Sequence, residues 1–596
     1  VSGSLTLAPA NMVHGAIVLD SGLAVPAGST LTLAAGVVLK WRNPYELTVD
    51  GTLLANGNAT DPVVVTSLAD DSAGGDTNGN GPSSGSPTAW RGIVFNPGSD
   101  ASTLHWLDAR FGGYGYVSNL HLNGASPTFV HCASRGCFTS GMNLNGAATP
   151  SVVACSFVGN GGYAIDNVPI AALPGFADNS AAGNTSGNFL RVTDGSLSTP
   201  LVVGSQSCLN GAIVFAANLH VLAGGDLTLQ QGVVCKFQGA YEAVIDGALH
   251  ARGTGYEPVV FTDLRDDEFG GDTNGDGPSG GQWLAWRGLT VPNTAAASSL
   301  EHVRLRFCGY GYVAALGNAS PLLSLRSVRA DRAYNHGIVL AAAAGTPTNL
   351  VAWGCGNYGI HLTGGSFAIA HATCNANHIG IRRENTWTGS VVNSISRGNN
   401  SADFDNFPAA QVFASNGAFA GQNGNLAVDP SFVDASNGDL HLSPTSPCLG
   451  AADLLTAFLS FADGDQNSRL LDHALLGLPL PDMGAFELGA WQMQVAGSTR
   501  LGTTLDYTIT GPAGVSFYLF GVLDGLLPVV PYGFFLAGGS ASLISPPIVT
   551  GTTFQLPVPP IPGLVGLQVG VQALTFPLNT TAVGNFTRLH QLLVRP

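Results

Sequence analysis

Charged side chains are scarce in this sequence of 596 residues, at 10% against a usual share of about 25%. Lysine occurs only at Lys40 and Lys236, and Met occurs four times, so the residues that favour helices are few. The net charge of 22 − 38 = −16 argues against a nucleic-acid binder that neutralises phosphates. No apolar run is long enough for a transmembrane helix, so none is expected.

The abundant residues indicate an ordered protein made of strands. Hydrophobic residues make up 45% of the chain, which is too many for a disordered protein. Gly occurs 80 times, and Val, Thr, Ser and Asn are frequent, which favours strands and tight turns. Nine cysteines fit an oxidising compartment. A first residue other than Met is what removal of a signal peptide leaves, although a cut made elsewhere gives the same start. We therefore expect a secreted, extracellular protein of the cell surface.

A long internal repeat organises the first two thirds of the chain. The matching segments, each 196 residues apart, are Gly15–Val18 with Gly211–Val214, Gly36–Val38 with Gly232–Val234, Trp90–Gly92 with Trp286–Gly288, and Gly113–Val117 with Gly309–Val313. A constant offset over this length means duplication without insertions. Residues 10–165 and 206–361 are therefore two copies of one unit, called here the first copy and the second copy.

A shorter period within each copy predicts a solenoid. Similar Asn/Gly-rich turns end near Tyr312, Gly337, Gly359 and Gly380, at steps of 25, 22 and 21 residues. The apolar stretches between them alternate with period two and lack a helical period, so each turn consists of strands. A leucine-rich repeat is the competing solenoid, but its regular Leu/Asn consensus is missing. The predicted fold class is all-β, a parallel β-helix of 15–18 turns.

The sequence resembles the right-handed parallel β-helix superfamily, the pectate-lyase-like fold of many secreted bacterial proteins. The segments that carry the resemblance are Leu23–Leu33, Gly36–Lys40, Asp429–Val433, Asp439–Pro444, Ser446–Cys448 and Pro481–Glu487. The resemblance covers residues 10–488 and implies the fold, whereas the function stays open because such folds host many activities.

We predict four parts along the chain: β-helix of the first copy at 1–200, β-helix of the second copy at 201–400, last turns and cap at 401–490, and an antiparallel β-sandwich at 491–596. The last part has five charged residues in 106, namely Arg500, Asp506, Asp524, Arg588 and Arg595. So few charges leave a small domain short of polar surface, so we expect this part to be an interaction domain. The sandwich is similar to domains appended to secreted bacterial surface proteins.

Each copy contains one acidic loop with the spacing of a calcium site. Oxygen-bearing residues at positions 1, 3 and 5, followed by Gly at 6, match the first half of a calcium-binding loop. A Glu at position 12 is missing, and paired aspartates upstream could complete the shell. The candidate ligands for Ca²⁺ are Asp266, Asp267, Asp272, Asn274 and Asp276 in the second copy, and Asp70, Asp71, Asp76, Asn78 and Asn80 in the first. The alternative is a solvated loop held by Asx turns, without metal.

Six cysteines are candidates for disulfides. Cys208 and Cys235 stand where the first copy has Met12 and Leu39, and a joint replacement is expected of a bonded pair. Two further pairs lie about one turn apart, Cys132 with Cys155 and Cys355 with Cys374. The alternative is that these residues are buried thiols acting as small apolar filler.

Arginines cluster in the second copy. If Val303, Leu305 and Phe307 point inward, then His302, Arg304 and Arg306 point outward along one strand, and the next turn adds Arg326 and Arg329. Such a stripe could bind a carboxylated or sulfated glycan. In related β-helix lyases Ca²⁺ neutralises a uronate and an Arg is the base. The alternative is a solvated face paired with Glu301 and Asp331.

Two classes of function remain open. The preferred hypothesis is a structural or adhesive protein that self-assembles into a surface filament or layer, through its C-terminal domain and termini; the segment Val1–Leu7 could add as a strand to a neighbour. The second hypothesis is a Ca²⁺-dependent lyase or hydrolase acting on an acidic polysaccharide, or non-catalytic glycan binding on the Arg-rich face. Neither hypothesis includes a nucleic-acid partner.

Overall fold

The computed structural model describes residues 1–457, 459–471 and 480–489 and parts of the C-terminal region. The described C-terminal residues are 492–497, 499, 502–511, 514–522, 527–529, 533–535, 542–543, 545, 547–561, 564, 567–577 and 585–594. Arg500, Asp524 and Arg595, on which the prediction of an interaction domain partly relied, lie outside these residues.

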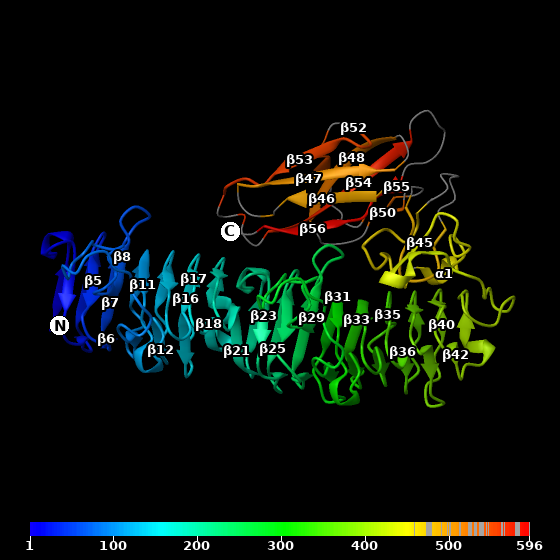
Figure 1. The fold of residues 1–596 in the computed structure, drawn as a ribbon. Coiled ribbons are helices and arrows are strands. Elements are labelled where there is room, and N and C mark those ends of the chain that lie inside the picture. Colours follow the sequence, from blue (N-terminus) through cyan, green and yellow to red (C-terminus); the bar gives the residue numbers. More distant parts are fainter. Residues whose placement is uncertain are drawn as a thin grey trace. The chain divides into compact units, whose positions relative to one another are not determined.

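The predicted fold class is confirmed: the chain is a parallel β-solenoid of about 17 turns, followed by small antiparallel sheets (Figure 1). Contacts divide it into two compact units, one of residues 1–247 and 261–286, the other of 248–260 and 287–596. Among the described residues, no helix combines the length and the apolar character needed to cross a membrane.

The first unit stacks three parallel sheets, one strand from each per turn. The first sheet is β1 (Ser4–Leu7), β4 (Thr30–Ala34), β7 (Thr52–Asn56), β10 (Thr103–His105), β13 (Thr128–Val130), β16 (Ser151–Val153) and β19 (Phe176–Ala177). The second is β2 (Ile17–Leu19), β5 (Val38–Trp41), β8 (Val63–Ser67), β11 (Leu107–Arg110), β14 (Ala133–Arg135), β17 (Ser156–Val158) and β20 (Ser180–Ala182). The third is β3 (Leu23–Val25), β6 (Glu46–Val49), β9 (Gly92–Phe95), β12 (Leu120–Asn123), β15 (Met142–Asn145), β18 (Tyr163–Pro169) and β21 (Gly187–Leu197).

The predicted alternation appears in the burial of these strands. In β4 the side chains of Leu31 and Leu33 are fully buried, whereas those of Thr30 and Thr32 face outward and are partly exposed. A single residue with positive φ makes the corner between the first and second sheets, for example Trp106 at 52° and His131 at 54°. A left-handed residue bends the chain sharply, so the strands on either side of it belong to different sheets.

The second unit continues the same pattern. One ladder runs through β28 (Ala248–Arg252), β31 (Ser298–Arg306), β33 (Leu323–Asp331), β35 (Val351–Trp353), β38 (Thr373–Asn375) and β41 (Ile395–Ser396). A second ladder runs through β30 (Leu289–Val291), β32 (Leu316–Asn318), β34 (Ile338–Leu340), β36 (Tyr358–Leu362), β39 (Ile379–Arg383) and β42 (Ala402–Asp405). A short third one joins β37 (Ile369–Ala370), β40 (Val391–Val392) and β43 (Val412–Phe413).

After the last turns the chain folds back onto the second unit. The returning part contains the hairpin β44 (Phe432–Asp434) with β45 (Asp439–Leu442) and the short helix α1 (Leu454–Ala457). Its apolar side chains Leu440, Ala485 and Phe486 pack on Val351 and Trp353 of the solenoid. We call the described residues of 429–487 the return segment.

The C-terminal region consists of antiparallel sheets. One sheet is β46 (Gln492–Gly497), β47 (Thr504–Thr510) and β53 (Thr553–Pro557); the other centres on β48 (Gly514–Val522) and β54 (Gln568–Pro577), with β56 (His590–Leu593) beside β54. Tyr507 of one sheet and Tyr518 of the other belong to the same buried cluster. The two sheets therefore share one core, as expected of a sandwich.

The segment Val1–Leu7 is not a free strand. Residues Ser4–Leu7 pair in parallel with Thr30–Leu33, and the amino group of Val1 donates to the carbonyl of Ala24 at 2.8 Å. Ser4–Leu7 is therefore the end strand of its sheet, and its addition to a neighbour stays a prediction.

Candidate functional site

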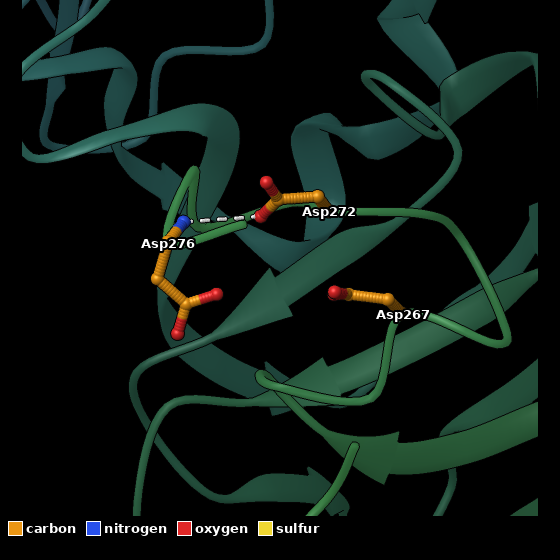
Figure 2. A group of neighbouring side chains, drawn as sticks. All are labelled: Asp267, Asp272 and Asp276. Atoms are coloured by element: carbon orange, nitrogen blue, oxygen red, sulfur yellow. Dashed lines mark hydrogen bonds between the residues drawn. The ribbon is translucent and has the colours of Figure 1, made fainter. Parts of the chain in front are cut away.

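The acidic loop of the second copy brings three carboxyl groups together. Oxygen atoms of Asp267, Asp272 and Asp276 lie within 4.8 Å of one another, and Figure 2 shows the three groups turned towards one space. Asp272 shapes the loop, because its Oδ1 accepts the amide of Gly275 at 2.7 Å and its Oδ2 accepts that of Gly277 at 3.0 Å. Both glycines have positive φ, 77° and 88°, which L residues rarely adopt.

Two orphaned oxygen atoms make the loop fit a calcium ion. Asp267 Oδ1 and Asn274 Oδ1 are buried and have no hydrogen-bond partner in the described structure. Oxygen ligands from carboxylates and amides are what Ca²⁺ takes. Asp266 is the exception among the predicted ligands: its side chain is buried and its Oδ2 accepts the hydroxyl of Thr262 at 2.6 Å. It lies outside the group of three carboxylates.

A buried lysine holds each acidic loop in place. This role of the two lysines was not predicted from the sequence. Lys236 Nζ donates to the carbonyl of Gly271 and to the hydroxyl of Thr273, both at 2.7 Å. Lys40 makes the matching bonds in the first copy, to Gly75 and Thr77, both at 2.8 Å. Burial lowers the pKa of Lys236 to about 8 although nearby aspartates oppose the shift. The sequence did contain a signal for this role, because the only two lysines of the chain are 196 residues apart and so occupy the same position in the two copies.

The loop of the first copy has the same backbone but fewer charges. Asp76 caps the amides of Gly79 and Gly81, and these bonds, with that of Gly81 the strongest, lower the pKa of Asp76. Asp71 accepts the amide of Ser83 at 2.6 Å, and Asp70 accepts the hydroxyls of Thr66 and Ser72. Asn80 stands where the second copy has Asp276, and Asn78 where it has Asn274. The described residues of this loop therefore form no group of three carboxylates.

The Arg-rich stripe of the second copy is not an exposed face. His302 and Arg306 are only 6% and 5% exposed, and Arg329 binds Asp331 at 2.7 Å and the carbonyl of Gly438 at 2.8 Å. Only Arg326 is exposed, with Glu301 at 3.8 Å. The inward positions are as predicted, because Val303, Leu305 and Phe307 are at most 2% exposed, but the prediction that the opposite face is open to solvent is wrong.

The return segment covers this face. Trp353 Nε1 donates to the carbonyl of Ala435 at 2.9 Å, and Asn349 Nδ2 donates to that of Ala462 at 2.9 Å. Arg469, which is fully buried, pairs with Glu487 at 2.7 Å and donates to Asn349 Oδ1 at 2.5 Å. These polar bonds are satisfied within the chain, so the face is a contact surface of the protein itself.

A small cavity of about 40 Å³ remains under the return segment. Its lining includes His302, Arg304, Arg329, Asn349 and Asp465. A space of this size holds a few water molecules and no sugar ring. Burial lowers the pKa of His302 to about 4, so this side chain is neutral at pH 7. The cavity therefore does not provide the glycan site that the stripe predicted.

Asp465 connects three parts of the second unit. It accepts His441 Nε2 at 2.7 Å and lies 3.7 Å from the guanidinium of Arg588, which stacks on Tyr256 at 3.9 Å. Although burial opposes the shift, Arg588 and His441 hold the pKa of Asp465 well below its usual range. Burial also opposes the shift of His441, yet its bonds to Asp439 and Asp465 raise its pKa to about 10. The C-terminal region thus contacts the solenoid of its own chain, where the hydroxyl of Tyr256 also donates to the carbonyl of Met493 at 3.1 Å.

A polar column on the second ladder of this unit was also missed. His361, Arg382 and Asp405 occupy one register position on consecutive turns. Glu384 accepts from His361 at 2.9 Å and Arg382 at 3.1 Å, and hydrogen bonds from these two residues lower its pKa. The ring of Tyr358 lies 4.8 Å from that of His361. Only the spacing of about one turn could have revealed this column, and the sequence analysis assigned it no role.

The described structure holds no disulfide among the nine cysteines, so none of the three predicted pairs is bonded. Cys132 and Cys155 do lie on neighbouring turns, and the amide of Cys132 donates to Cys155 Sγ at 3.3 Å. In-register side chains of a parallel sheet are about 4.8 Å apart, too far for the Cβ spacing of a disulfide. Cys374 pairs instead with Ala352, three residues before Cys355. Cys208 and Cys235 are also not bonded, and the structure does not explain why.

Comparisons with known proteins assign no family. No family model matches the chain, and no curated protein matches its sequence.

Proposed function

We propose that the protein is an extracellular structural or adhesive β-solenoid, of the right-handed β-helix superfamily that its sequence resembles, which self-associates through its C-terminal sheets. The observation that carries this proposal is the exposed apolar surface of these sheets. Val549, Ile561 and Leu567 are 53%, 55% and 42% exposed in a region with very few charges. Exposed apolar side chains of this kind mark interaction surfaces.

The assembly is tested with the full chain by electron microscopy and sedimentation. Val549→Glu together with Ile561→Glu places charge on the apolar surface, and Gln555→Glu, also exposed, is the matched control. We expect ordered polymers from the unmodified chain and the control, and dispersed particles from the double variant. A full chain that stays monomeric at all concentrations contradicts the proposal.

Calcium is the cofactor that we propose for the second-copy loop. Asp267, Asn274 and the carboxylates of Asp272 and Asp276 would hold the ion, which would offset the repulsion among the three carboxylates. Its role there would be to stiffen the turn that Asp272 shapes through its bonds to Gly275 and Gly277. The first-copy loop, with Asn80, would bind the ion more weakly.

Glycan binding is a second candidate function, and we place it at the polar column and not at the Arg-rich stripe. The polar column of His361, Arg382, Glu384 and Asp405 beside Tyr358 offers hydrogen-bonding groups next to an aromatic ring, as sugar sites do. Binding of acidic polysaccharides to the full chain, compared with Tyr358→Ala and with Tyr114→Ala as an exposed control, tests it. Equal binding by the two variants contradicts this candidate.

A further inference from the structure

The first sheet of the first unit carries a regular array of hydroxyl groups on its outer face. One column is Thr6, Thr32, Leu54, Thr103, Thr128 and Ser151, joined in register from strand to strand. Two residues earlier lies a second column. Ser4, Thr30 and Thr52 are in register on β1, β4 and β7, whereas Ala101, Ser126 and Thr149 lie just before β10, β13 and β16. Ten of these twelve positions are Ser or Thr.

These hydroxyls are available to solvent. All the Ser and Thr residues of the two columns are partly or fully exposed. A bond links Ser126 to Thr149, with 3.3 Å between their hydroxyl oxygens. Within the described part of the chain, the hydroxyls of Ser4, Thr6, Thr30, Thr32, Thr52, Thr103, Thr128 and Ser151 bind no other protein group. No ionisable side chain interrupts the columns; Asp100 lies at their rim, where it accepts the amide of Ser126.

The second copy shows that the array is not a requirement of the fold. Without the last position of each column, Ser151 and Thr149, ten positions remain, and eight of them carry a hydroxyl. Only three of their counterparts 196 residues later do so, namely Thr228, Ser299 and Ser324. Thr30 is replaced by Asp226, Leu54 by His250 and Ser126 by Leu322. The strands of the second copy form without the array, so β-propensity alone does not explain it.

We propose that this hydroxyl array binds the surface of ice. Neighbouring strands space the hydroxyls of a column about 4.8 Å apart, and on β1 and β4, which carry hydroxyls of both columns, alternate residues lie about 6.6 Å apart. Such a rigid, uncharged grid orders water in two dimensions, with repeats close to those of the ice lattice, while the Thr methyl groups fill the gaps. Since each hydroxyl both donates and accepts, it can replace a lattice water.

Two other occupants fit the array less well. A second copy of this chain would bury an area of roughly 30 Å by 10 Å, far below the about 800 Å² per partner of a stable interface, and would leave hydroxyls unpaired in a dry contact. A crystalline polysaccharide would be expected to stack on aromatic rings, and neither column contains one.

The experiment measures inhibition of ice recrystallisation, and adsorption to a growing ice surface, by the full chain. Thr128→Lys places a charged side chain in the middle of the array, and Ser324→Lys makes the same change at the matching position of the second copy. We expect the unmodified chain and Ser324→Lys to adsorb to ice. The protein concentration that inhibits ice recrystallisation should be at least about tenfold higher for Thr128→Lys than for the unmodified chain, with an unchanged circular dichroism melting curve.

Several outcomes overturn the proposal. They are a full chain that does not adsorb to ice, equal activity of the two variants, and binding of crystalline cellulose in place of ice. Thr128→Val, which keeps shape and removes the hydroxyl, guards against a folding defect of the lysine variant and should also weaken adsorption. These results are independent of self-association, because the Val549 and Ile561 variants should keep ice adsorption.

Discussion

The two copies share a backbone fold but differ in whether the outer surface at one corner is open or covered by another part of the chain. At the corner between the first two strands of a turn, the first copy has Trp106, Asp108 and Arg110, where the second has His302, Arg304 and Arg306. In the first copy Trp106 stacks on His131, with ring centres 4.6 Å apart, along an open groove of about 340 Å³. In the second copy the return segment covers the corner and leaves about 40 Å³.

This difference shows that the arginines of the second copy are contact residues. In the first copy Arg110 and Arg135 both pair with Asp108, and Arg135 stays half exposed. In the second copy Arg329 reaches Gly438 and Arg469 reaches Asn349, so the charges hold one part of the chain on another. A cluster of arginines in a sequence therefore does not by itself indicate a ligand.

The largest expected effect is at Arg469. Arg469→Ala removes a fully buried guanidinium and leaves Glu487 without its partner, which should lower the free energy of unfolding by about 3–5 kcal/mol. Arg135→Ala breaks a half-exposed pair of the first copy and should cost at most about 1 kcal/mol. Denaturant unfolding followed by tryptophan fluorescence measures both. Equal effects would mean that the return segment is not held through Arg469.

Calcium should distinguish the two acidic loops. Saturating Ca²⁺, at about 100 times the dissociation constant, should stabilise the chain by about 2.7 kcal/mol, seen as a rise in melting temperature. Asp276→Asn gives the second loop the residue of the first and should remove most of this rise. Asn80→Asp makes the reverse change and should add a second site in calorimetric titration. If neither Ca²⁺ nor a chelator changes the melting temperature of the unmodified chain, the proposed calcium site is wrong.

The lysines under the loops should matter alike in both copies. Lys40→Met and Lys236→Met each remove two hydrogen bonds from a buried ammonium, and each should lower the free energy of unfolding by about 1–3 kcal/mol. Hydrogen exchange of the two loops provides the measurement. Unchanged exchange in either variant would show that its lysine does not hold its loop.

The smallest effect is a pH dependence that arises in the return segment, which has no counterpart in the first copy. Because the pKa of His441 is raised to about 10 in the folded chain, its contribution is complete below the unfolded value of about 6.5 and is lost as pH rises towards 10. Stability should therefore decline over this range more steeply in the unmodified chain than in His441→Gln. Parallel pH profiles of the two proteins would refute the contribution.

The sequence predicted the repeat, the solenoid and the antiparallel C-terminal sheets, because periods and turn residues are local signals. It also located the carboxylates of Asp267, Asp272 and Asp276, whose spacing within one loop is again local. The burial of His302 and Arg306 could not be predicted, because a segment more than 100 residues away covers this part of the solenoid. The pair Cys132 and Cys155 failed for another reason: spacing of about one turn predicts stacking, and stacking in register does not make a disulfide.

Chemical labelling of histidines in the native full chain tests most directly the claim that the return segment closes the corner of the second copy and that the first copy is open. Diethyl pyrocarbonate, followed by mass spectrometry, reports the solvent access of each ring. The structure predicts rapid modification of His131, which is exposed, and protection of His302 and His371, which are buried. Labelling of His302 as fast as that of His131 would contradict the account.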